Sequence, residues 1–224
     1  MISAIVFDFD GVLADSETLH LRAYQQVLAP LGGQMSREEY FARYLGFDDA
    51  GVFRAFADDR GWTLGEEQIE DLIAAKTSFF EAIETEADLL FPGAEACVRR
   101  MAGEFPLGIA SGALRHEIEV VLDRAGLRGC FRFIVASGDT PSSKPAPDPY
   151  VRAAALHARE PAACLAIEDS RWGIESARAA GMACVGITQS YAREELAGAD
   201  RIIDSLDELT PALVRSLRPT ARPS

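Results

Sequence analysis

The chain has 224 residues, of which 48% are hydrophobic and 25% are charged, a composition typical of a globular protein with room for a large core. Its formal net charge of −13 argues against nucleic acid or an anionic membrane as a partner, because both need a basic face. No apolar run approaches the ~20 residues that span a bilayer, and the N-terminal apolar run meets Asp8 too soon for a signal peptide. We therefore expect a cytoplasmic protein with no membrane partner.

Two acidic residues stand at the end of the first hydrophobic segment. Residues 2–9 are predicted to form a buried strand, whose alternation would place Asp8 and Asp10 on one side and Phe7 and Phe9 on the other. Two like charges at a buried strand end cost folding free energy unless a cation balances them. Such a pair suits a divalent metal ion, a nucleophile with an acid/base partner, or a combination of these.

Residues 16–88 show only helical patterns, interrupted by glycines. The expected helices cover 17–30, 36–45, 48–60 and 66–86. Since the strand at 2–9 has no partner within this block, it must pair with strands that come later. The helical block is therefore predicted to be an insertion between the first strand and the rest of its sheet.

From Phe91 onward, short apolar runs alternate with helical patterns. Strands are expected at 106–110, 132–136, 163–168, 183–187 and 201–203, and helices at 93–103, 113–125, 149–158 and 172–180. We interpret Gly173 as a small residue that lets the last of these helices sit close to the sheet. The pattern predicts an α/β fold with a Rossmann-like parallel sheet covered on both faces. The expected domains are a core (1–15 and 89–213), an all-helical cap (16–88) and a C-terminal tail (214–224).

Polar residues follow the expected strands at the edge where parallel sheets bind ligands. Ser111 and Gly112 follow the second strand, Lys144 follows the third, and Glu168 and Asp169 end the fourth. Lys144 is one of only two lysines in the chain, which otherwise uses arginine as its cation. Together with the first acidic pair, these residues are typical of a metal-assisted phosphoryl-transfer site.

Four stretches carry a resemblance to a known family. They are DFDGVLADSE (8–17), IASGA (109–113), SKPAPDPY (143–150) and IEDSRWGIESARAAGMACVGI (167–187). Their residues and order resemble the haloacid dehalogenase superfamily, in the subgroup with a helical cap after the first strand. The beta-phosphoglucomutase-like and phosphoglycolate-phosphatase-like members are the most similar.

The resemblance implies a Mg²⁺-dependent phosphatase that works through an aspartyl-phosphate intermediate. Asp8 would be the nucleophile, and Asp10 would protonate the leaving alkoxide and later deprotonate the attacking water. Asp8, the backbone carbonyl of Asp10 and Asp169 would hold Mg²⁺, with Glu168 as a further ligand or a supporting residue.

Substrate binding is assigned by the same resemblance. Ser111 and Gly112, with helix N–H groups, would bind phosphoryl oxygens, and Lys144 would balance the charge of the carboxylates and the phosphate. The cap would close over the core and set specificity. His20 and Lys76 are its candidate substrate contacts.

Two other functions stay open beside hydrolysis of a small phosphomonoester. Beta-phosphoglucomutases have an arginine shortly after a cap glycine, which binds a second phosphate. In this sequence the corresponding residues 46–50 carry acids instead. This departure favours a phosphatase of the sugar-phosphate or phosphoglycolate type over a mutase. A non-catalytic phosphate-binding regulator is the remote alternative. The expected partner is a small phosphorylated metabolite, bound by a monomer or weak dimer.

Overall fold

The computed structural model describes residues 1–44, 47, 49–84 and 89–217. The chain forms two units, one made of Met1–Asp15 with Leu90–Ser224 and the other of Ser16–Leu89. We call them the α/β unit and the helical unit. None of the described helices combines the length and the apolar character needed to cross a membrane.

The α/β unit is built on a six-stranded sheet in which all paired strands are parallel. The strand order is β3-β2-β1-β4-β5-β6. The strands are β1 (Ala4–Phe7), β2 (Leu107–Ala110), β3 (Phe131–Val135), β4 (Cys164–Glu168), β5 (Ala183–Ile187) and β6 (Arg201–Ile203). The predicted α/β class with a parallel sheet is confirmed, and β1 pairs with strands that follow the helical unit in sequence.

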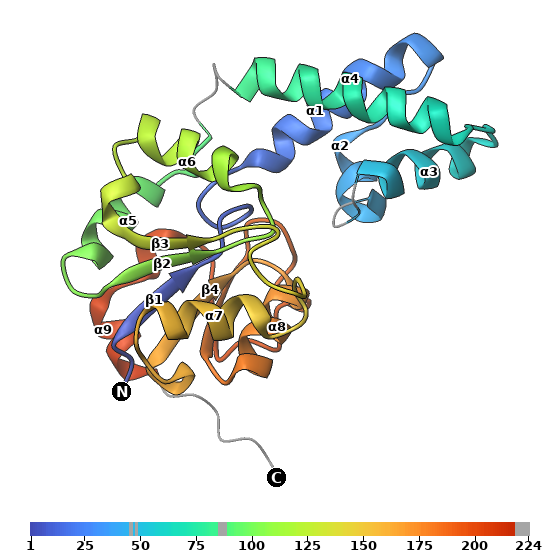
Figure 1. Ribbon diagram of the computed structural model, residues 1–224. Helices are drawn as coiled ribbons and strands as arrows, with labels where there is room; N and C mark the ends of the chain where they lie inside the picture. The colour runs from blue at the N-terminus through green and yellow to red at the C-terminus, as the bar shows by residue number, and fades with distance from the viewer. Residues whose placement is uncertain (45–46, 48, 85–88, 218–224) are drawn as a thin grey trace. The chain divides into compact units, whose positions relative to one another are not determined.

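The central strands are buried on both faces, which explains why they read as continuous apolar runs. One face packs Val6 and Ala166 against Tyr150 of α7 (Asp148–Leu156) and Ile174 of α8 (Arg171–Ala180). Figure 1 shows these two helices along the sheet. On this face, α8 begins at Arg171, close to the carboxyl end of β4 at Glu168.

The remaining helices of the α/β unit are α5 (Ala94–Ala102), α6 (Arg115–Arg124) and α9 (Pro211–Ser216). The expectation of a tail from residue 214 onward is wrong for residues 214–216, which belong to α9. Thr210 caps this helix by accepting a hydrogen bond from the backbone N–H of Leu213, and Val214 is fully buried. The rest of the expected tail, 218–224, lies outside the described residues.

The helical unit contains α1 (Ser16–Leu28), α2 (Arg37–Glu39), a π-helical turn (Tyr40–Tyr44), α3 (Asp49–Arg60) and α4 (Glu66–Glu84). Its core is aromatic, with Tyr24, Phe53 and Phe56 buried among aliphatic side chains. The expected helix over 36–45 is split between α2 and the π-helical turn. The expected helix ends at residues 45, 48 and 85–86 lie outside the described residues.

His157 caps the C-terminus of α7 and is buried in the α/β unit. Its Nε2 lies 3.3 Å from the carbonyl oxygen of Ile5, and its ring meets Phe133 edge to face. Burial lowers the pKa of His157, the charges of Arg132 and Arg159 lower it further, and the contact with Ile5 opposes them. The folded protein therefore favours the neutral imidazole.

We expect this burial to reduce stability in acid. As the pH falls below about 6.5, the unfolded chain binds a proton at His157 that the folded chain resists, so the free energy of unfolding decreases. In His157→Gln this decrease should be smaller, by up to roughly 1.4 kcal/mol per pH unit. Urea unfolding between pH 7.5 and 5 measures it, with the exposed His116→Gln as control. Equal pH slopes for wild type and His157→Gln would contradict the expectation.

Candidate active site

Two strand ends meet where the strand order of the sheet reverses. β1 ends at Phe7, directly before Asp8, and its neighbour β4 ends with Glu168, directly before Asp169. The backbone N–H of Asp8 donates to Ile167 O at 2.9 Å, which fixes the two ends side by side. Doubly wound sheets bind their ligands at such a point. Three of the acids singled out in the sequence therefore converge here.

Lys144 is the cation of this site. Its Nζ lies 3.0 Å from Asp8 Oδ1 and 2.7 Å from Glu168 Oε1, and its side chain is 13% exposed. Burial alone would lower the pKa of Lys144, but the two carboxylates raise it above its ordinary value. Lys144 is therefore charged at neutral pH and bridges the ends of β1 and β4.

Glu168 is fully buried, and one of its oxygens accepts two hydrogen bonds. Oε1 accepts from Lys144 Nζ at 2.7 Å and from the Tyr150 hydroxyl at 2.5 Å. Burial raises the pKa of Glu168, Lys144 counteracts this shift, and the negative charge of Asp8 adds to it. A Cβ placed on Gly173 would lie 1.9 Å from Oε2, so the carboxylate occupies the space of a missing side chain.

Asp169 completes the acidic group and is also buried. Burial raises the pKa of Asp169 well above its ordinary value, Asp8 and Glu168 add to the shift, and a hydrogen bond from Ser190 opposes it. A Cβ on Gly11 would lie 1.8 Å from Asp169 Oδ2, and Gly11 has a φ of +73°. Only glycine fits there, for both space and backbone conformation.

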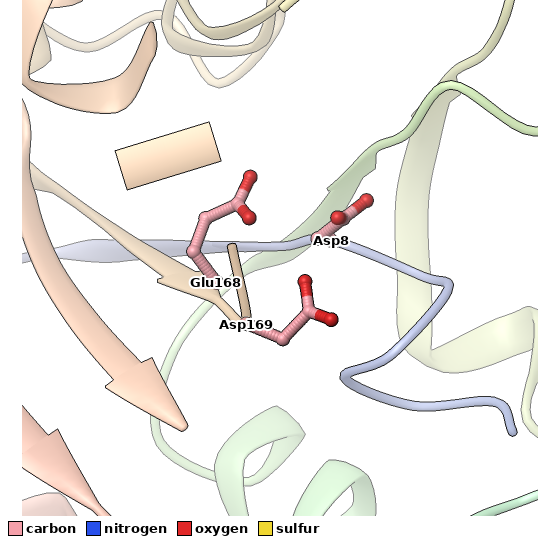
Figure 2. Close-up of side chains that lie close together, drawn as sticks. All are labelled: Asp8, Glu168 and Asp169. Atoms are coloured by element: carbon pink, nitrogen blue, oxygen red, sulfur yellow. The ribbon is translucent and has the colours of Figure 1, made fainter. Parts of the chain in front are cut away.

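Asp8, Glu168 and Asp169 form what we call the acidic cluster (Figure 2). Each offers a carboxylate oxygen, and these oxygens lie within 4.8 Å of one another. Three carboxylates face one ammonium group, so two negative charges remain when all are ionised, which adds to the effect of burial in raising the pKa values of Glu168 and Asp169. An all-oxygen donor set with this charge fits a hard divalent metal ion.

Asp10 lies beyond the strand rather than in it. β1 ends at Phe7, and Asp10 is a half-buried residue whose backbone forms a bridge with Ala14. The strand alternation expected through residue 9 therefore stops early. Asp10 is not part of the acidic cluster, and its acid/base role stays a prediction.

Ser111 and Gly112 follow β2 at the same edge of the sheet. Ser111 is buried and its Oγ accepts a hydrogen bond from the backbone N–H of Ala113 at 3.2 Å, whereas Gly112 is exposed. The helix expected from residue 113 begins at Arg115, because the chain first makes a local turn. Ser111 is therefore not the N-cap of α6, and phosphate binding by both residues stays a prediction.

His20 and Lys76, the two candidate contacts of the expected cap, lie together in the helical unit. Lys76 Nζ is 2.8 Å from His20 Nδ1, and 2.8 and 3.1 Å from the two carboxylate oxygens of Asp49. Burial lowers the pKa of His20 to about 3, and the charge of Lys76 adds to this effect. A neutral His20 thus accepts the hydrogen bond from Lys76, whose charge is balanced by Asp49. Substrate binding by the pair stays a prediction.

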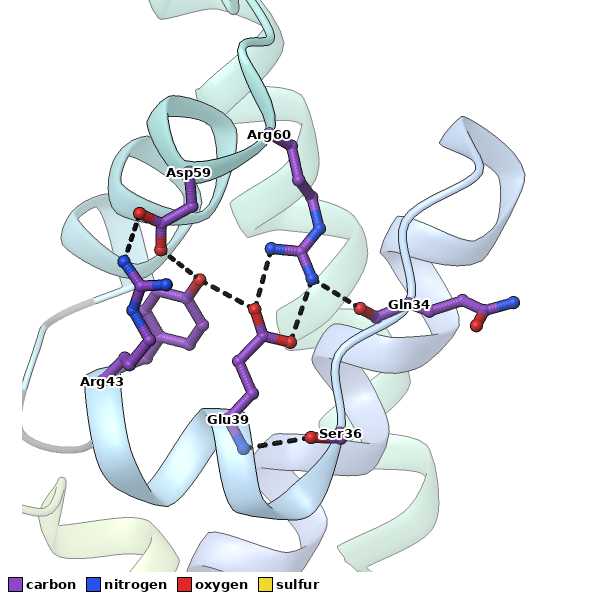
Figure 3. A network of polar contacts seen from close by, with 7 residues as sticks. Gln34, Ser36, Glu39, Arg43, Asp59 and Arg60 are labelled. Carbon is purple, nitrogen blue, oxygen red and sulfur yellow. Dashed lines mark hydrogen bonds and ion pairs between the residues drawn. The ribbon is translucent and has the colours of Figure 1, made fainter.

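Arginines of the helical unit also pair within that unit (Figure 3). Arg60 binds both oxygens of Glu39 at 2.8 and 2.9 Å, and Arg43 pairs with Asp59. The Tyr44 hydroxyl donates to Asp59 at 2.6 Å. These guanidinium groups balance acids of neighbouring helices, so we assign them to the stability of the unit.

Sequence reasoning missed two residues that fix Glu168. Tyr150 was part of the SKPAPDPY stretch, but nothing in its spacing indicates that its hydroxyl meets a strand end 18 residues later. Gly173 was interpreted as a close approach of helix to sheet, whereas the structure shows that it makes room for a carboxylate. The signal that could have found Tyr150 is its hydroxyl group, a polar atom on a residue type that otherwise packs in the core, in the same SKPAPDPY stretch as Lys144.

The chain is similar to several known proteins. A model of haloacid dehalogenase-like hydrolases matches residues 2–181. The chain is 33% identical to protein CbbY of Rhodobacter capsulatus over 95% of this chain and 97% of CbbY. It is 33% identical to hexitol phosphatase B of Escherichia coli K12 over 93% of this chain and 95% of that protein. A solved structure of a CbbY variant from Rhodobacter sphaeroides with xylulose-(1,5)bisphosphate has a TM-score of 0.77 and 33% identity, covering 93% of this chain and 96% of that chain.

Proposed function

The chain belongs to the haloacid dehalogenase-like hydrolase family, and we propose that it is a Mg²⁺-dependent phosphatase acting on a small phosphomonoester of the sugar-phosphate or phosphoglycolate type. The observation that carries this proposal is the acidic cluster bridged by Lys144 at the carboxyl ends of β1 and β4. The name of hexitol phosphatase B and the sugar bisphosphate bound to CbbY support a phosphorylated sugar as substrate.

Asp8 is the proposed nucleophile. Its Oδ1 accepts from the backbone N–H of Phe9 at 2.7 Å and lies 3.0 Å from Lys144 Nζ, which leaves Oδ2 to attack phosphorus. The attack forms an aspartyl-phosphate and releases an alkoxide, which Asp10 protonates. Asp10 then takes a proton from water, and the resulting hydroxide attacks phosphorus to release inorganic phosphate and restore Asp8.

The other residues of the site would stabilise charge on the transferring phosphoryl group. Lys144 balances part of the negative charge, and Ser111 and Gly112 would donate to phosphoryl oxygens. The acidic cluster and the backbone carbonyl of Asp10 would hold Mg²⁺, which when bound supplies further positive charge to the phosphoryl oxygens. The net charge of −13 makes such local positive charge necessary for binding an anion.

The helical unit favours hydrolysis over mutase chemistry. A mutase needs a second anion site for its doubly phosphorylated intermediate, and the resemblance places an arginine near residue 49 for that purpose. Here Asp49 stands in that region, bound to Lys76 and to the hydroxyl of Tyr24 at 2.5 Å. An acid paired with Lys76 in this way supplies no positive charge for a second phosphate, unlike the arginine expected in a mutase.

Phosphate release from a panel of sugar phosphates, phosphoglycolate and nucleoside monophosphates tests the function. We expect inorganic phosphate to appear with Mg²⁺ and to be lost when EDTA removes the metal. With beta-glucose 1-phosphate, formation of glucose 6-phosphate without phosphate release would instead show a mutase. Turnover of no phosphoester in the presence of Mg²⁺ would favour the non-catalytic regulator.

A further inference from the structure

Tyr150 makes a hydrogen bond to which the proposed reaction gives no role. Its hydroxyl lies 2.5 Å from Glu168 Oε1, and the whole side chain is buried. The ring packs in the core between α7 and the sheet, a place that phenylalanine would fill equally well. The hydroxyl therefore serves a purpose other than packing.

The Tyr150 hydroxyl can only act as a donor to Glu168. Burial raises the pKa of Tyr150 well above its ordinary value, and the charge of Glu168 adds to the shift, so the phenol keeps its proton. Lys144 Nζ donates to the same Oε1 at 2.7 Å and lies 5.1 Å from the centre of the Tyr150 ring. Two donors from different segments thus converge on one carboxylate oxygen.

The carboxylate of Glu168 is also confined by the shape of the site. It fills the space that a Cβ on Gly173 would need, since that position lies 1.9 Å from Oε2, 2.0 Å from Cδ and 2.1 Å from Oε1. With Oε1 bound to two donors, Oε2 3.5 Å from the Ser170 hydroxyl and the whole group against Gly173, the carboxylate is held in one orientation. In that orientation it lies with Asp8 and Asp169 in the acidic cluster.

We propose that Tyr150 is a positioning residue that acts through Glu168, holding its carboxylate in the place where the acidic cluster binds a divalent cation. The inference rests on the proposed function only for the presence of a metal ion in this cluster. Groups that hydrogen-bond to metal-ligating carboxylates orient those ligands, and their removal lowers metal affinity about 10- to 100-fold. Lys144 cannot replace this contact, because it is shared with Asp8.

Metal binding by Tyr150→Phe tests the proposal. We expect the Kd for Mg²⁺ by calorimetry, and for Mn²⁺ by electron paramagnetic resonance, to rise about 10- to 100-fold. Thermal unfolding should show a folded protein, and the KM for substrate at saturating metal should change little. Tyr44→Phe is the matched control, because it removes a buried hydroxyl that donates to a carboxylate in the helical unit. It should keep the Kd of the wild type.

A wild-type Kd in Tyr150→Phe would overturn the proposal, since the retained ring would then account for the whole role of the residue. A wild type that binds neither cation would overturn it as well. A wild type that binds metal but releases phosphate from no ester would contradict the proposed function alone. The binding measurement would still decide the role of Tyr150 in that case.

Discussion

Asp8→Asn is expected to lower phosphate release by on the order of 10⁴-fold or more, the scale seen when a covalent nucleophile is removed. An amide has no charged oxygen with which to attack phosphorus, so no aspartyl-phosphate can form. The fold should persist, because asparagine has the same shape and the change removes one of three crowded negative charges. Phosphate release at saturating Mg²⁺ measures the effect, and circular dichroism verifies the fold.

The matched control is Asp123→Asn, which removes the charge of an exposed aspartate on α6 of the same unit. This variant should retain activity within a few-fold of the wild type. Trapping of a phosphorylated protein during turnover adds a direct test, since the wild type should carry the label on Asp8. Retained turnover in Asp8→Asn, or a label elsewhere, would remove Asp8 as the nucleophile.

The fold class could be predicted because each element leaves a local trace in the sequence. Strands buried on both faces give short apolar runs, and the runs at 183–187 and 201–203 match β5 and β6 at both ends. The order of the strands leaves no such trace. The pairing of Ala4 with Cys164 joins distant parts of the chain, and only the topology rules for parallel sheets suggest it.

The position of a candidate site residue could be predicted where the residue directly follows a strand, as Asp8 follows β1 and Asp169 follows β4. Lys144 lies further from its strand, which ends at Val135, and its place beside Asp8 depends on the fold. The roles proposed for Tyr150 and Gly173 could not be predicted, because they depend on contacts with Glu168 that form only in the folded chain and not on the spacing of residues in the sequence. The sequence gives no sign that both act on Glu168, a residue for which it left open either a metal ligand or a supporting role.

Gly173→Ala is the second change for which we expect a large effect. Alanine in place of glycine within a helix normally stabilises a protein by roughly 1 kcal/mol when there is room for the methyl group. Here the new Cβ would lie 1.9 Å from Glu168 Oε2 and 2.0 Å from Cδ, so the carboxylate must move. A ligand displaced by about 1 Å lowers the rate by about 10²-fold. We therefore expect phosphate release to fall by at least that factor, together with weaker Mg²⁺ binding.

A double-mutant cycle on the free energy of unfolding separates this clash from a general effect of alanine. With Glu168 intact, overpacking should cost roughly 1–3 kcal/mol and outweigh the helix preference. In a Glu168→Ala background the obstructing carboxylate is absent, so Gly173→Ala should become neutral or stabilising. Gly129→Ala, where an added Cβ meets nothing within 4 Å, should change neither activity nor metal binding. If Gly173→Ala is as active as the wild type and more stable, Glu168 does not need the position in which the structure holds it, and both Gly173 and Tyr150 lose their assigned roles.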